Sequence, residues 1–273
     1  MPPAIRFLVP VLATSILFAA ESHSLKTPPH VNIPLWDAGN VPLASGDAPL
    51  DAPFLTVFLP RGGKTNGSAV VVAPGGGNIM MMYDVEGMQI AEQFNDWGAA
   101  AFVLTYRLEP YGEDARALDG NRAVQLVRSR AKEWGVDPAK IGFIGFSAGS
   151  SLARLVGATA KSGDPSATDP LSKVSSRPDW LGLVYGPGRT RPDEDLKTFP
   201  PSFLLAAAWD KGAANSTVEL FQKMNKAGTV AELHIYQKGR HGFGASIGSP
   251  EYGTWMPELR HFLMQGGFLP RGQ

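Results

Sequence analysis

The sequence predicts an α/β protein with a doubly wound, mostly parallel sheet that carries helices on both faces. Two observations support this prediction. Short, almost unbroken apolar segments recur along the chain, as expected of strands covered on both sides. Segments with the period of amphipathic helices separate them. The chain has 273 residues, of which 44% are apolar, so it can build one large domain with a substantial core.

The alternation of strands and helices begins at residue 54. In the helix expected over 115–134, apolar residues recur at the i, i+4 spacing of one buried face. The segment 23–53 is rich in proline and weakly patterned, so we expect a loop along the domain edge. The segment 186–200 is too short for a large cap domain. In order, we expect strands at 54–59, 68–73, 100–106, 140–144, 180–185, 202–208 and 231–237, and helices at 85–97, 115–134, 148–153, 213–227 and 256–266.

The first residues have the pattern of an export signal. Arg6 precedes an apolar run over 7–20, and Ala20 and Ser22 are small residues at the positions that a signal peptidase reads. We therefore expect a signal peptide over 1–22, a single domain over 23–273, and a secreted or periplasmic protein. No stable membrane insertion is expected after cleavage, and an uncleaved membrane anchor is the alternative.

The composition excludes several classes of function. Lys and Arg number 25 and Asp and Glu number 25, so the formal net charge is zero and a nucleic-acid partner is not expected. Charged residues make up 18% of the chain, below the roughly 25% usual for soluble domains, which favours a compact enzyme. The chain has no cysteine, which excludes disulfides, a thiolate nucleophile and cysteine-ligated metal sites.

The segment 145–149 reads G-x-S-x-G and lies between an expected strand and an expected helix. In a nucleophile elbow the serine occupies a sharp strand-to-helix turn, and the two glycines let strand and helix approach closely. The turn exposes the serine oxygen, and the helix N-terminus favours negative charge beside it. Ser147 is therefore the candidate nucleophile. The motif alone is a weak signal, because loops use both residue types.

A serine hydroxyl needs a neighbouring base to become a nucleophile at neutral pH. His241 is the candidate base, because it lies in a glycine-rich loop directly after an expected strand, where the functional edge of an open α/β sheet should be. The other histidines are expected to be ordinary surface or hydrogen-bonded residues: His23, His30, His234 and His261.

Asp210 is the candidate acid that orients the imidazole, because it follows the expected strand over 202–208. The chain order Ser147, Asp210, His241 is that of nucleophile, acid and base in α/β-hydrolases. A helix N-cap or a loop acid is the alternative role for Asp210. Asp119 is expected to be structural, and the fallback acids are Asp193, Glu194 and Asp195.

A developing oxyanion needs backbone N–H donors. Gly76 and Gly77 belong to a triglycine segment directly after the strand over 68–73, and Ala148 follows the candidate nucleophile. Glycines let backbone amides face a substrate with no side chain in the way. We expect these three amides to form an oxyanion hole, while a flexible turn is the alternative for the glycines.

Together these residues resemble the α/β-hydrolase superfamily and, within it, the sugar-ester acetyl esterases, which include xylan esterases and xylanase-associated lipase-like proteins. Three departures stand out: Pro74 replaces the histidine of the lipase-like H-G-G-G, Lys211 stands where relatives carry a second aspartate, and Ser150-Ser151 replaces Gly-Gly. The matching segments are 72–77, 86–87, 104–108, 121–123, 131–135, 141–149, 177–180, 200–203 and 240–243.

The resemblance implies a serine carboxylesterase that hydrolyses short acyl esters, acetyl esters above all, on a small-molecule or carbohydrate alcohol, with no metal or cofactor. The alternatives are a peptidase of the same fold and a non-catalytic binding protein. The methionine-rich segment 78–83 either lines the acyl or leaving-group pocket or packs in the core. The sequence does not indicate an oligomeric state.

Overall fold

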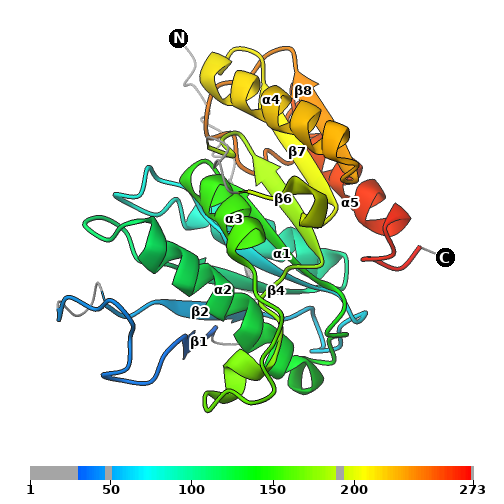
Figure 1. Cartoon of the computed structure of the whole chain (residues 1–273). Coiled ribbons are helices and arrows are strands. Elements are labelled where there is room, and N and C mark those ends of the chain that lie inside the picture. The colour runs from blue at the N-terminus through cyan, green and yellow to red at the C-terminus, as the bar shows by residue number, and fades with distance from the viewer. Residues whose placement is uncertain (1–29, 47–50, 189–193, 272–273) are drawn as a thin grey trace, which may run out of the picture.

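The computed structural model describes residues 30–46, 51–188 and 194–271. The expected signal peptide over 1–22, the first part of the 23–53 segment and Asp193 lie outside these residues. The described residues form one eight-stranded sheet in the order β1-β2-β4-β3-β5-β6-β7-β8 (Figure 1). The strands are β1 (Val31–Pro34), β2 (Phe54–Phe58), β3 (Ala69–Ala73), β4 (Ala100–Thr105), β5 (Ile141–Phe146), β6 (Trp180–Val184), β7 (Ser202–Ala207) and β8 (Ala231–Tyr236).

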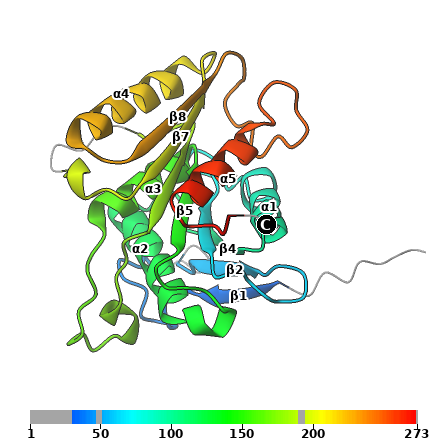
Figure 2. The ribbon, with the colours of Figure 1, turned by 90° about the vertical axis from the view of Figure 1, so that its right-hand side faces the viewer.

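Strands β3 to β8 pair in parallel, whereas β1 and β2 are antiparallel to their neighbours. Helices α2, α3 and α4 cover one face, and α1 and α5 cover the other (Figure 2). The predicted mostly parallel sheet with helices on both faces is therefore confirmed. The helices are α1 (Gln89–Asp96), α2 (Glu113–Ser129), α3 (Ala148–Thr159), α4 (Lys211–Ala227) and α5 (Trp255–Gln265), with short turns η1 (Asp84–Met88), η2 (Ala131–Trp134), η3 (Pro170–Lys173) and η4 (Leu196–Thr198).

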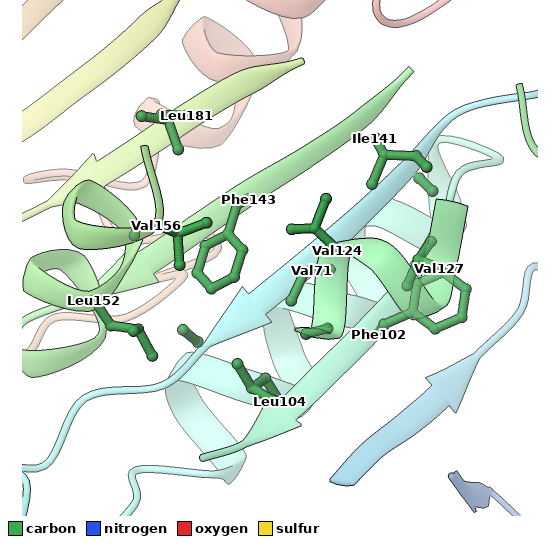
Figure 3. Packing of buried hydrophobic residues seen from close by; sticks show 14 of the residues in the cluster. Val71, Phe102, Leu104, Val124, Val127, Ile141, Phe143, Leu152, Val156 and Leu181 are labelled. Carbon is green, nitrogen blue, oxygen red and sulfur yellow. The ribbon is translucent and has the colours of Figure 1, made fainter. Parts of the chain in front are cut away.

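Alternation along the central strands divides the apolar residues between two cores. On β3, Val71 faces the α2 and α3 side, where Phe102 and Phe143 pack with residues of both helices (Figure 3). Val70 and Val72 face the opposite side, which holds residues of α1 and α5. Both faces are covered, so the central strands read as continuous apolar runs in the sequence.

Close helix packing on the first face depends on Gly120 in α2. A Cβ atom there would lie 2.3 Å from Val156 Cγ2 in α3, well inside van der Waals contact. The small residue brings α2 and α3 together over β5, and α3 begins directly after the candidate nucleophile. The tight packing of α2 against α3 therefore fixes the position of Ser147 at the start of α3.

Three expected boundaries differ from the structure. Part of the expected N-terminal loop forms β1, which pairs with β2 at the sheet edge. The helix expected over 115–134 ends at Ser129 and is followed by the separate turn η2. The helix expected over 85–97 is divided into a π-helical turn, η1, and α1.

An ion pair lies beneath the loops that follow β4. Arg107 Nη2 and Asp119 Oδ1 are 2.8 Å apart, and both side chains are buried. Asp119 is thus structural, as the sequence predicts. Burial raises the pKa of the Asp119 carboxyl, and the hydrogen bonds and charge of Arg107 oppose that shift.

No helix in the described part of the chain is long and apolar enough to cross a bilayer.

Candidate active site

Ser147 occupies the turn between β5 and α3 with φ 51° and ψ −116°, a conformation that costs a non-glycine residue about 1–3 kcal/mol. The flanking glycines permit it. A Cβ atom on Gly145 would lie 1.9 Å from the Gly149 carbonyl oxygen, and one on Gly149 would lie 2.0 Å from the Ala73 carbonyl oxygen. The G-x-S-x-G segment therefore folds as a strained elbow because only glycines fit on either side of the serine.

The structure brings Ser147, His241 and Asp210 together at the carboxyl ends of β5, β8 and β7. Ser147 Oγ lies 2.6 Å from His241 Nε2, and His241 Nδ1 is hydrogen-bonded to Asp210 Oδ2. A carboxylate only accepts hydrogen bonds, so Nδ1 carries the proton and Nε2 is free to accept the serine hydroxyl proton. The imidazole is therefore oriented as a base toward the serine.

Asp210 makes the contacts that both of its predicted roles require. It is the N-cap of α4, where its Oδ1 accepts the Ala213 amide at 3.4 Å, while Oδ2 faces His241. The fallback acids have other partners. Glu194 forms a buried ion pair with Arg154, and Asp195 accepts the Lys197 amide at the start of η4.

Gly76 and Gly77 form a turn with positive φ angles of 127° and 66°, which side-chain-bearing residues rarely adopt. Gly77 and Ala148 line the same cavity as Ser147 and His241. Within the described residues, no protein group accepts a hydrogen bond from the amides of Gly76, Gly77 or Ala148. The amides of Gly77 and Ala148 therefore have no protein acceptor among the described residues at this cavity, whereas Gly76 is not among the residues that line it.

Two buried side chains anchor the loop that carries these glycines. Tyr106 donates its hydroxyl to the Pro74 carbonyl oxygen at 2.7 Å, and the Gly75 amide donates to Glu86 Oε2 at 2.7 Å. Burial raises the pKa of the Glu86 carboxyl, and hydrogen bonds from Tyr185 and Gly75 and the charge of His241 oppose the shift. Burial, followed by the neighbouring Glu86 charge, also raises the pKa of Tyr185.

Glu86 and Tyr185 have no role among the residues that the sequence singles out. Residues 86–87 match the resembling esterases, but this match gave Glu86 no role, and an acidic residue near the start of a helix is ordinarily exposed. Tyr185 ends an apolar strand and reads as one more core residue. Their contact joins positions far apart in the sequence, so local patterns do not reveal it.

The cavity at Ser147 has a volume of about 330 Å³. Of the methionine-rich segment, Met81 and Tyr83 pack against the two cores, whereas Ile79 and Met80 are exposed. Among the described residues, no cluster of three His, Asp or Glu side chains is placed to hold a metal ion. The cavity is lined by Gly77, Ser147, Ala148, Ser151, Tyr185, Gly186, Gly188, Asp210, Ala213, Ser216 and His241.

Comparison with known proteins agrees with this geometry. Residues 55–177 match the BD-FAE family model. The structure is similar to that of an acetyl ester-xyloside bifunctional hydrolase from Caldicellulosiruptor lactoaceticus, with 31% sequence identity, a TM-score of 0.78, and coverage of 88% of this chain and 97% of the other. The chain belongs to the BD-FAE family of α/β-hydrolase esterases. The resemblance drawn from the sequence is thus confirmed.

Three further proteins are similar to this BD-FAE chain. An acetylxylan esterase from Xylanibacter ruminicola is 28% identical over 74% of the chain, and endo-1,4-beta-xylanase B from Butyrivibrio fibrisolvens is 32% identical over 63%. The chain spans only 44% and 32% of the lengths of these two proteins. Esterase 2 of Thermogutta terrifontis has the same fold, with 24% identity, a TM-score of 0.69, and coverage of 90% and 97%.

Proposed function

We propose that the protein is a serine carboxylesterase that hydrolyses short acyl esters, in particular acetyl esters of sugars. The observation that carries this proposal is the hydrogen-bonded series from Ser147 Oγ through the His241 imidazole to Asp210. Membership of the BD-FAE family supports the same reaction class.

In the first half-reaction, His241 Nε2 takes the proton of Ser147 Oγ as that oxygen attacks the ester carbonyl carbon. The carbonyl π electrons move to the oxygen, and the resulting oxyanion is held by the amides of Gly76, Gly77 and Ala148. When the intermediate collapses, the bond to the alcohol oxygen breaks. The alcohol leaves with the proton from His241, and the acyl group stays on Ser147.

In the second half-reaction, water takes the place of the alcohol. His241 removes one proton from the water as its oxygen attacks the acyl carbon, and the same amides stabilise the second oxyanion. The bond to Ser147 Oγ then breaks, and His241 returns the proton to that oxygen. Asp210 holds the imidazole tautomer and stabilises its charged form in both steps.

The composition of the cavity favours ester over glycoside hydrolysis. Glycosidases use two carboxyl groups about 5–9.5 Å apart on either side of the bond. Among the described residues that line the cavity at Ser147, Asp210 is the only carboxylate, and it is already bonded to His241. An adjoining cavity of about 110 Å³, lined in part by Asn78, Glu113 and Arg116, presents polar groups suited to sugar hydroxyls.

Initial rates on 4-nitrophenyl acetate, butyrate, octanoate and xyloside, together with acetate release from acetylated xylan, test the proposal. We expect acetate esters to be preferred and Ser147→Ala to abolish turnover. Preference for octanoate would contradict the short-acyl assignment. A fluorophosphonate probe that labels the wild type and not Ser147→Ala separates an esterase from a non-catalytic protein of this fold.

We also propose that residues 1–22 direct export and are removed before His23, on the basis of their basic start, apolar run and small residues at the cleavage positions. N-terminal sequencing of the protein recovered from the periplasm or medium of a bacterial host tests this. A mature chain that begins at His23 is expected, and a full-length chain retained in the cytoplasm would contradict it.

A further inference from the structure

Glu86 is a buried carboxylate that the proposed chemistry does not use. Only 1% of the residue is exposed. It lies in η1, a single π-helical turn that follows the triglycine loop, and π-helical turns occur often at functional sites. The turn directs the side chain beneath the loops of the active site instead of toward solvent.

Each oxygen of this carboxylate accepts a hydrogen bond from a different loop. Oε2 accepts the Gly75 amide at 2.7 Å, and Oε1 accepts the Tyr185 hydroxyl at 2.7 Å. The Tyr185 oxygen in turn accepts the Gly244 amide at 3.0 Å. Gly75 precedes the oxyanion glycines and Gly244 lies three residues after His241, so one carboxylate joins the two loops that flank Ser147.

The packing around this network is tight. A Cβ atom on Gly75 would lie 2.8 Å from Glu86 Oε2 and 2.8 Å from Ser147 Cβ. The Tyr185 ring packs edge-on against the His241 ring, with centroids 5.2 Å apart, and against Phe243 at 4.6 Å. A change at the carboxylate is therefore transmitted directly to the backbone beside the nucleophile and to the imidazole.

Among the described residues, the hydrogen-bond donors to this carboxylate are the Gly75 amide and the Tyr185 hydroxyl, and both are neutral. A positive charge on the His241 imidazole lowers the pKa of the carboxyl, but His241 does not bond to it. A buried carboxylate with neutral donors is costly to keep, because its charge is not cancelled by a counter-ion. The arrangement thus contributes more to the placement of the two loops than to stability.

We propose that Glu86, acting through Gly75 and Tyr185, is a positioning residue that holds the oxyanion loop and the histidine loop at the separation which the tetrahedral intermediate requires. The role rests on the esterase function proposed above. Glutamine cannot reproduce it, because an amide offers one acceptor and one donor group where two donors point at the carboxylate. Glu86→Gln therefore loses one of the two loop contacts while keeping the size of the side chain.

The test compares Glu86→Gln, Tyr185→Phe and the double variant with the wild type. We measure kcat and KM on 4-nitrophenyl acetate and the inhibition constant of phenylboronic acid, which forms a tetrahedral adduct with an active serine. For Glu86→Gln we expect kcat to fall about 10- to 100-fold with little change in KM, because a displacement of about 1 Å in reacting groups costs as much as 100-fold. Boronate binding should weaken by the same factor as kcat/KM, since it mimics the transition state.

The double variant should be no slower than Glu86→Gln alone, because both substitutions interrupt one path. Asp179→Asn is the matched control. Asp179 also accepts a backbone amide, that of Ile141 at 2.8 Å, and pairs with Arg128, but at the opposite end of β5 from Ser147. This control should lower thermal stability and leave kcat and boronate affinity at wild-type values.

Wild-type kcat and boronate affinity in folded Glu86→Gln and Tyr185→Phe would overturn the proposal. A loss of activity that is fully explained by a smaller fraction of folded protein would also overturn it. Tyr185→Phe decides the matter if Glu86→Gln does not fold, because it removes a single hydroxyl. The same assay on the wild type and on Ser147→Ala tests the esterase function. If the wild type does not turn over the ester, the proposed function fails; if it does and the Glu86 and Tyr185 variants match it, only this inference fails.

Discussion

The edge of the sheet that carries the candidate active site and the interior beside α2 both contain a buried carboxylate, but they hold it differently. Asp119 receives the guanidinium of Arg107, so two opposite charges meet. Glu86 receives two neutral donors and faces His241. The interior thus pairs its buried charge with an opposite charge, whereas the active-site edge keeps a buried carboxylate without a cationic partner among the described residues, beside a strained backbone turn. Substitutions in the two regions should separate activity from stability.

The largest effect is expected at the nucleophile. Ser147→Ala removes the attacking oxygen and leaves only binding and the oxyanion donors, so kcat should fall at least about 1,000-fold. The free energy of unfolding should change little, because the side chain is only partly buried and its hydrogen bond among the described residues is to His241. Steady-state kinetics and urea unfolding measure the two quantities. A Ser147→Ala variant that keeps its activity but loses stability would contradict the expected division between an edge that serves activity and an interior that serves stability.

Asp210→Asn tests the same edge of the sheet at the residue that contacts His241 and does not contact Ser147. The amide holds the wrong imidazole tautomer when its NH₂ group faces Nδ1, so kcat should fall about 1,000- to 10,000-fold. The N-cap hydrogen bond to Ala213 survives through the amide oxygen, so α4 should keep its stability. Asp210→Ala is the control, because it loses both roles and should also unfold at lower denaturant.

Arg107→Met tests the interior. At neutral pH we expect the free energy of unfolding to fall by about 3–5 kcal/mol, because Asp119 is left charged and unpaired. Burial already raises the pKa of Asp119 in the folded wild type, and the loss of the arginine should raise it further in the variant. The deficit should therefore be small below the wild-type folded pKa, grow as pH rises toward the variant's higher folded pKa, and level off above it. Urea unfolding from pH 4 to 8 measures it.

The matched control for that experiment is Arg130→Met, at the exposed pair with Glu133. It should cost less than about 1 kcal/mol. A deficit in Arg107→Met that does not depend on pH would mean that lost packing, and not the unpaired carboxylate, explains the change. The kcat of the folded fraction should stay at the wild-type value.

The smallest expected effect concerns stored strain. Ser147→Gly should be more stable than Ser147→Ala by about 1 kcal/mol, because glycine adopts a positive φ of 51° without a Cβ penalty. Both variants lack the hydroxyl, so the difference isolates the backbone. Equal unfolding midpoints would show that the elbow is not strained in solution.

The sequence anticipated the meeting of Ser147, Asp210 and His241 because each follows an apolar strand, and the carboxyl ends of parallel strands share one edge of a sheet. It did not anticipate β1, since this short edge strand has one partly buried residue, Ile33, and therefore no visible alternation. The inward direction of Glu86 depends on the π-helical turn η1, and its partners Gly75 and Tyr185 lie in the segments that follow β3 and β6. Such long-range contacts have no local sequence signature.

The central claim is that the Ser147 oxygen forms a covalent acyl intermediate. Rapid acid quench of the enzyme during turnover of 4-nitrophenyl acetate, followed by mass spectrometry of its peptides, tests this directly. We expect an added acetyl group on the peptide that contains Ser147 and none in Ser147→Ala. Turnover with no acetyl group on Ser147, or with the group on another residue, would contradict it.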